Sequence, residues 1–126
     1  MSVRAKKPNK LYFKCDTLSL FHVLGKKWTV DVIEILNHNK ELSFNAILRM
    51  LRGATPRALS NILSDLSAAQ VVKKTEPKKS GAMRASYVLT SKGKLFEKFI
   101  RSGKQLGVDL YSIDAGCVDR ECSNCR

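Results

Sequence analysis

The residues with the clearest potential for chemistry are four cysteines. Cys117, Cys122 and Cys125 form a Cys-x4-Cys-x2-Cys cluster near one end of the sequence, and Cys15 lies near the other. Three thiolates need a fourth ligand to complete a tetrahedral zinc site, and Cys15 is the candidate for that position. In a reducing cytosol this cysteine spacing favours a metal site over structural disulfides. The exception is a hyperthermophile, in which disulfides inside the cell are common. Zinc binding, disulfide or redox chemistry, and inert thiols are the open alternatives.

No residue pattern in the chain indicates catalysis. The two histidines, His22 and His38, are isolated, and no Ser-His-Asp or Cys-His set, glycine-rich phosphate loop or close carboxylate pair occurs at usable spacing. No run of about 18 apolar residues exists to cross a bilayer, and the first residues lack the apolar middle of a secretory signal. We therefore expect a cytoplasmic protein that is not an enzyme and has no membrane partner.

The charge of the chain points to a polyanionic partner. Its 126 residues carry a formal net charge of +12, and nucleic acid is the leading candidate because counterion release drives the binding of basic proteins to it. Residues 1–14 contain five basic side chains and no acid, and residues 73–104 contain ten basic side chains and two acids. We expect 1–14 to be a flexible basic arm, 15–114 a folded domain and 115–126 a cysteine-containing tail.

Three helices are expected in the first part of the folded domain, between residues 16 and 53. Residues 16–24 and residues 27–37 have apolar side chains at helical spacing, and Trp28 is expected to anchor the core. Residues 41–43 are expected to be a short link in which Ser43 caps a third helix that ends at Gly53. The first three helices should therefore pack around one modest core.

A fourth helix is the candidate recognition helix. Thr55 is a good N-cap, and Pro56 suits the first helical position because its missing N–H would have no partner there. One face is apolar and packs inward, while the opposite face carries short polar or basic groups that suit base edges and phosphates. The candidate DNA contacts from this segment are Thr55, Pro56, Arg57, Ser60, Asn61 and Ser64.

A basic β-hairpin is expected to follow the fourth helix. Val71 and Val72 open a strand, residues 77–81 form a turn cluster, and residues 86–89 return as a second strand. A two-stranded ribbon of this kind reaches phosphates or the minor groove beside a recognition helix. The candidate contacts from the hairpin are Lys73, Lys74, Lys78, Lys79 and Arg84.

A long helix is expected to close the domain, beginning after a cap at Thr90 or Ser91. Its apolar residues recur at spacings of three and four, and such a seam requires a second helix. We expect a homodimer whose interface contains Phe96, Phe99, Leu106, Leu110 and Ile113. The order of elements predicts an α+β, mostly α fold, a winged helix-turn-helix with a long C-terminal dimerisation helix.

Four segments in order carry a family resemblance. Cys15 stands thirteen residues before the tryptophan of LGKKWT (24–29), and LSFNAI (42–47), LRGATPRALS (51–60) and YVLTSKG (87–93) follow. Through these motifs about three-fifths of the chain resembles the HxlR family of winged helix-turn-helix transcriptional regulators, a branch of the MarR-like superfamily. The resemblance implies a homodimer that binds a pseudo-palindromic duplex, and a redox-sensing role for Cys15, whose thiolate a helix N-terminus and Lys14 would favour.

The chain departs from the family pattern just before the hairpin. Where the family usually has Glu-x-x-Gly-Leu-Val, this sequence has Ser-Ala-Ala-Gln-Val-Val at 67–72, so the turn lacks its glycine. Two other readings fit the same charge. One is an architectural, chromatin-like protein that binds nucleic acid without sequence preference, and the other is a protein-interaction module that keeps the fold without binding DNA.

Overall fold

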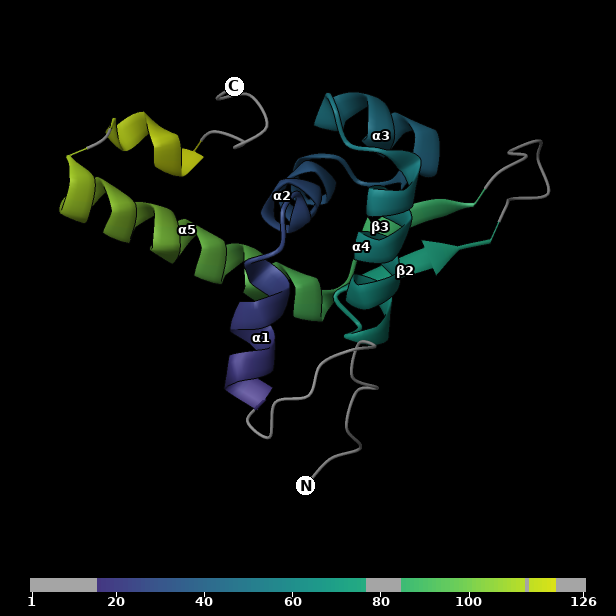
Figure 1. Ribbon diagram of the computed structural model, residues 1–126, viewed down its shortest axis with the longest axis horizontal. Helices are drawn as coiled ribbons and strands as arrows, with labels where there is room; N and C mark the ends of the chain where they lie inside the picture. The colour runs from purple at the N-terminus through teal and green to yellow at the C-terminus, as the bar shows by residue number, and fades with distance from the viewer. Residues whose placement is uncertain (1–15, 77–84, 113, 120–126) are drawn as a thin grey trace.

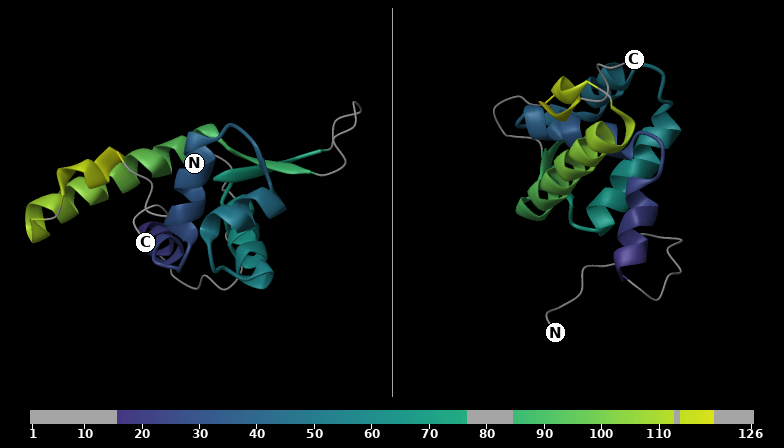
Figure 2. Two further views of the ribbon diagram at one scale, coloured as in Figure 1. Left: turned by 90° about the horizontal axis from the view of Figure 1, so that it is seen from above. Right: turned by 90° about the vertical axis from the view of Figure 1, so that its left-hand side faces the viewer.

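The computed structural model describes residues 16–76, 85–112 and 114–119 (Figure 1). In these ranges the chain forms five α-helices, three strands and one 3-10 helix. In chain order they are α1 (Asp16–Leu24), α2 (Thr29–His38), β1 (Leu42–Ser43), α3 (Phe44–Leu51), α4 (Pro56–Ala68), β2 (Val72–Thr75), β3 (Ser86–Leu89), α5 (Ser91–Tyr111) and η1 (Ala115–Asp119). Figures 1 and 2 show α5 and the β2–β3 hairpin projecting in opposite directions from the helical body. The predicted winged helix-turn-helix fold is confirmed.

The sheet contains one strand that the sequence did not predict. Residues 41–43 were expected to be a link, but Leu42 and Ser43 form β1 and pair antiparallel with Tyr87 and Ser86. The sheet order is β1-β3-β2, with β3 in the middle. A strand of two residues is too short to show alternation, and its pairing partner lies far along the chain, which explains why the expectation was wrong.

The second helix begins two residues later than expected. It was predicted from Lys27, but Trp28 has a φ of 75° in the left-handed region, so the helix begins at Thr29. The Trp28 ring is partly buried and packs against the core, as expected, and the Nζ of Lys27 lies 5.1 Å from the ring centroid. The left-handed residue redirects the chain between α1 and α2 while keeping the ring inside.

One hydrophobic core joins the helices and the sheet. Helix α2 is buried on nearly all sides, whereas α3 and α4 each bury a single apolar stripe. This pattern places α2 at the centre and leaves one face of α4 exposed. The buried apolar side chains of the described residues are Val23, Val32, Ile33, Ile35, Leu36, Ile47, Leu51, Leu59, Ile62, Leu63, Leu66, Val71, Val72 and Ile100.

The turn that lacks the family glycine nevertheless has the geometry that glycine normally provides. Gln70 has a φ of 63°, in the left-handed region. Its N–H donates to the carbonyl of Ser67 at 3.0 Å, and the N–H of Val71 donates to the carbonyl of Leu66 at 2.9 Å. These two bonds are the Schellman pairing that ends a helix. The substitution therefore changes the residue at the turn and leaves the turn itself in place.

Helix α5 ends at Tyr111, where Ser112 adopts a left-handed conformation with a φ of 54°. Ile113, expected on this helix, lies beyond its end and outside the described residues. The chain then turns back, and η1 packs along α5, with Arg101 donating to Oδ1 of Asp119 at 2.8 Å. That hydrogen bond raises the pKa of Arg101 above its ordinary value. Of the helices described, none has the length and apolar character that crossing a membrane requires.

Candidate nucleic-acid interface

The turn between α3 and α4 is defined by local hydrogen bonds. Ser43 caps α3 by accepting from the N–H of Ala46 at 3.2 Å, as predicted from the sequence. Thr55 caps α4 by accepting from the N–H of Ala58 at 3.1 Å, and Pro56 occupies the first turn. These side chains satisfy N–H groups that a helix start leaves without partners, so both helices have defined starts.

Helix α4 presents the predicted polar residues on one exposed face. Its inward stripe consists of buried leucines and an isoleucine. At 100° per residue, the outward residues occupy a continuous arc of the helix. Arg57 and Asn61 lie toward one edge of that arc, and Ser60 and Ser64 lie toward the edge beside the sheet. The structure therefore brings together all six candidate residues of this segment: Thr55, Pro56, Arg57, Ser60, Asn61 and Ser64.

The hairpin carries two of the predicted lysines beside α4. Lys73 and Lys74 are exposed on β2, and Lys74 lies opposite Tyr87 of β3. The end of β2 nearest the hairpin turn is held by Thr75, whose hydroxyl donates to Oε2 of Glu41 at 3.0 Å. The other candidates of the hairpin, Lys78, Lys79 and Arg84, lie outside the described residues.

Two ion pairs connect the helices of the domain to one another. Lys26 donates to Oδ2 of Asp65 at 2.7 Å, which ties the α1–α2 turn to α4. Lys104 of α5 pairs with Glu34 of α2, and their side chains are only 8% and 3% exposed. The second pair joins the central helix of the domain to the helix predicted to dimerise. Glu34 and Lys104 were not singled out from the sequence, where each reads as an ordinary charged helical residue.

The predicted dimer residues occupy different positions on α5. Phe96 packs against the core of its own domain. Phe99, Leu106 and Leu110 are exposed, and with Leu95 and Gly103 they fall in a stripe about 80° wide at 100° per residue. The ring of Phe99 meets Phe21 of α1 edge-on at a centroid distance of 5.7 Å. We call this surface the α1–α5 apolar face, and its exposed members are Leu18, Phe21, Leu95, Phe99, Leu106 and Leu110.

The cysteines are described only in part. Cys117 is partly buried in η1, and its thiol is free. Cys15, Cys122 and Cys125 lie outside the described residues. The described part of the chain contains no group of three or more histidine, cysteine, aspartate or glutamate side chains that could bind a metal ion. The zinc and redox hypotheses therefore stay predictions.

Comparison with known proteins agrees with this architecture. A family model described as HxlR-like helix-turn-helix matches residues 23–112. No curated protein sequence matches the chain. The reduced form of the transcriptional regulator YodB from B. subtilis is similar with a TM-score of 0.72 and 20% identity, covering 81% of this chain and 100% of that chain.

Two further solved structures are similar over most of their length. Diamide-treated YodB from B. subtilis gives a TM-score of 0.66 and 21% identity, with 80% of this chain and 97% of that chain covered. A possible HxlR family transcriptional factor from Thermoplasma volcanium GSS1 gives a TM-score of 0.62 and 26% identity, with 75% and 83% covered. All three share the winged helix-turn-helix fold.

Proposed function

The chain belongs to the HxlR-like helix-turn-helix family, and on that premise we propose that it is a sequence-specific transcription regulator that binds double-stranded DNA as a homodimer in the cytoplasm. The family is one of transcription regulators and not of enzymes. The observation that carries the proposal is the face of α4, which exposes Arg57, Ser60, Asn61 and Ser64 beside a hairpin bearing Lys73 and Lys74. Lys73 and Lys74 are suited to contact phosphates, and Arg57 and Asn61 are suited to contact base edges.

Base recognition is assigned to the outer edge of α4. Arginine pairs with guanine and asparagine with adenine through two hydrogen bonds in the major groove, and each good pair discriminates by about 1–3 kcal/mol. Arg57 and Asn61 are four residues apart on the same edge of α4, so both reach the same groove. The hairpin residues, including Lys78, Lys79 and Arg84 outside the described ranges, provide backbone contacts in this proposal.

The dimer is proposed to form through the α1–α5 apolar face. Exposed apolar patches of this kind mark protein contacts, and the stripe on α5 has the spacing of a helix-packing seam. An added Cβ at Gly103 would meet nothing within 4 Å, so the middle of the stripe leaves room for a facing side chain. A hollow of about 410 Å³ beside it, lined in part by Phe21, Val30 and Phe99, offers the same partner a place to pack.

The dimer is tested by placing charge in the stripe. Leu106→Glu with Leu110→Glu should give folded monomers, because both side chains are exposed in the single chain but buried in the proposed dimer. The control is Lys94→Glu with Lys98→Glu, two exposed positions on the same helix outside the stripe. Light scattering should show a dimer for wild type and control. A dimer that persists in the leucine variant would contradict the proposed interface.

DNA binding is tested by selecting duplexes from a random pool with the full chain. A dimer with one recognition helix per subunit should enrich inverted half-sites whose centres lie about 10 base pairs apart, the spacing of successive major grooves. The alternative, an architectural protein without sequence preference, predicts binding without enrichment. Enrichment of a site without twofold symmetry would contradict the homodimeric mode of binding.

We also propose that the thiols make DNA binding responsive to oxidants or to zinc. The position of Cys15 is similar to that of the family cysteine, and YodB has been solved in reduced and diamide-treated forms. Zinc held by Cys117, Cys122 and Cys125 with Cys15 is the competing form of this proposal. In both forms the cysteines regulate DNA affinity, and the exposed face of α4 contacts the bases.

A further inference from the structure

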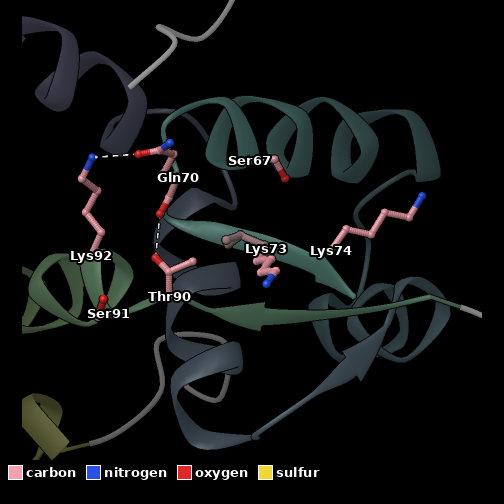
Figure 3. Close-up of a pocket in the computed structure, with 8 residues that line it drawn as sticks. Ser67, Gln70, Lys73, Lys74, Thr90, Ser91 and Lys92 are labelled. Carbon is pink, nitrogen blue, oxygen red and sulfur yellow. Dashed lines mark hydrogen bonds between the residues drawn. The ribbon is translucent and has the colours of Figure 1, made fainter. Parts of the chain in front are cut away.

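A groove runs between α4 and the sheet, on the side of α4 away from Arg57 and Asn61. Three adjoining hollows make up the groove, and Lys74 lines all three. Its α4 wall consists of Leu63 and three serines, and Tyr87 forms part of its floor. At its far end it widens to a hollow of about 560 Å³ between the end of α4 and the start of α5 (Figure 3). We call this the serine–lysine groove, after the serines and lysines that line it: Ser60, Ser64, Ser67, Lys73, Lys74 and Lys92.

The electrostatics of the groove are one-sided. No described carboxylate lines any of its three hollows, whereas three lysines do. Among the described residues, no aspartate or glutamate forms an ion pair with Lys73, Lys74 or Lys92. Uncompensated lysines beside hydroxyl groups bind phosphate oxygens, through charge from the lysines and hydrogen bonds from the hydroxyls. The ligand chemistry that fits is therefore a row of phosphates.

The length and position of the groove fit one strand of a duplex. Ser60, Ser64 and Ser67 follow α4 at helical spacing, and the rise from the first to the last is about 10 Å at 1.5 Å per residue. A strand that follows the groove is inclined to the duplex axis, along which its phosphates rise only about 3.4 Å each, so roughly two phosphates of one strand fit over that distance. Because the groove lies alongside the face that carries Arg57 and Asn61, a strand in it would flank the major groove that those residues enter.

Lys92 lies at the far end of the serine–lysine groove, where an uncharged side chain holds it in place. Its Nζ donates to Oε1 of Gln70 at 3.2 Å, and the main-chain carbonyl of Gln70 accepts from the hydroxyl of Thr90 at 2.6 Å (Figure 3). The amide orients the ammonium group without neutralising it, in contrast to a carboxylate. In Figure 3, Lys74 extends from β2 toward α4. Lys74 and Lys92 therefore lie at different points along the serine–lysine groove.

We propose that the serine–lysine groove holds the sugar–phosphate backbone of one strand of the bound duplex, with Lys92 as a phosphate contact outside both the recognition helix and the hairpin. The inference rests on the proposed function, because it needs a duplex on α4. It extends the binding site to the first turn of α5, the helix that leads to the dimer face. The recognised group is the phosphodiester linkage, so the contact is independent of base sequence.

The test measures the salt dependence of affinity for a duplex selected from a random pool by the full chain. One lost phosphate contact lowers the slope of log affinity against log salt by about 0.9, so the fall in affinity between 50 and 200 mM salt becomes about three- to fourfold smaller. Lys92→Ala should show this change and Lys92→Arg should restore the slope. Lys94→Ala, an exposed lysine on the same helix turn and outside the groove, is the control.

A second measurement locates the contact on the DNA. Methylphosphonate linkages, which carry no charge, are placed one at a time along the selected duplex. One linkage that weakens the wild type should leave Lys92→Ala unaffected, because the contact is already lost. An unchanged slope for Lys92→Ala, or an equal change for Lys94→Ala, would overturn the inference while α4 recognition stands. If the wild type bound no duplex at all, the proposed function would fail first.

Discussion

The ion pair between Glu34 and Lys104 gives the sharpest prediction about stability. Removing one partner of a buried pair takes away its attraction while the remaining charge stays buried, which costs about 3–5 kcal/mol. Glu34 is 3% exposed and Lys104 is 8% exposed, so solvent screening is weak. Glu34→Gln should therefore lower the urea midpoint by about 1.5–2.5 M, for a slope of about 2 kcal/mol per molar urea.

The double variant Glu34→Leu with Lys104→Met separates burial from attraction. Replacing both charges with apolar groups of similar volume removes the desolvation penalty together with the attraction, so its stability should equal or exceed that of wild type. The control is Asp119→Asn, which removes the exposed ion-pair partner of Arg101, a residue on α5 like Lys104. This change should leave the urea midpoint nearly unchanged. Urea unfolding followed by circular dichroism, at one protein concentration, measures all three. A Glu34→Gln variant as stable as Asp119→Asn would refute the reasoning.

Two further predictions concern the left-handed turn and the thiols. Gln70→Gly should keep or raise stability by up to about 1 kcal/mol, because glycine adopts a positive φ without strain, whereas Gln70→Val should destabilise the protein; equal melting temperatures for both would contradict the turn geometry. If Cys117, Cys122, Cys125 and Cys15 bind zinc, elemental analysis of fresh protein should find one metal per chain, and chelation should lower the melting temperature. If Cys15 is a sensor, the protein should be free of metal, and diamide should change DNA affinity in wild type but not in Cys15→Ser. Metal-free protein whose affinity ignores diamide would remove both ideas.

Features set by neighbouring residues could be predicted from the sequence. The caps at Ser43 and Thr55, and the exposed face of α4, depend on side chains within one helical turn, and the structure has them as predicted. The resemblance to the HxlR family, read from ordered motifs, is confirmed by the family match. The absent glycine before the hairpin marked the position where Gln70 takes a positive φ.

Features that depend on distant pairings could not be predicted. Strand β1 exists because Leu42 meets Tyr87, forty-five positions further along the chain. The groove exists because β2 brings Lys74 beside α4, and no local pattern marks Ser67 or Lys92 as part of it. Glu34 lies on a helix buried on most sides, so its partner on α5 becomes visible only once the helices are packed.

The central claim, that α4 reads DNA sequence, is tested most directly by one ratio of affinities. The ratio compares the affinity of the full chain for its selected duplex with its affinity for a random duplex of equal length at the same salt concentration. For Arg57→Ala with Asn61→Ala, losing one good base pairing of about 1–3 kcal/mol would reduce this ratio about 5- to 150-fold, and losing two would reduce it further. The account predicts at least the smaller reduction, with affinity for random duplex much less affected. Equal losses on both duplexes would contradict it.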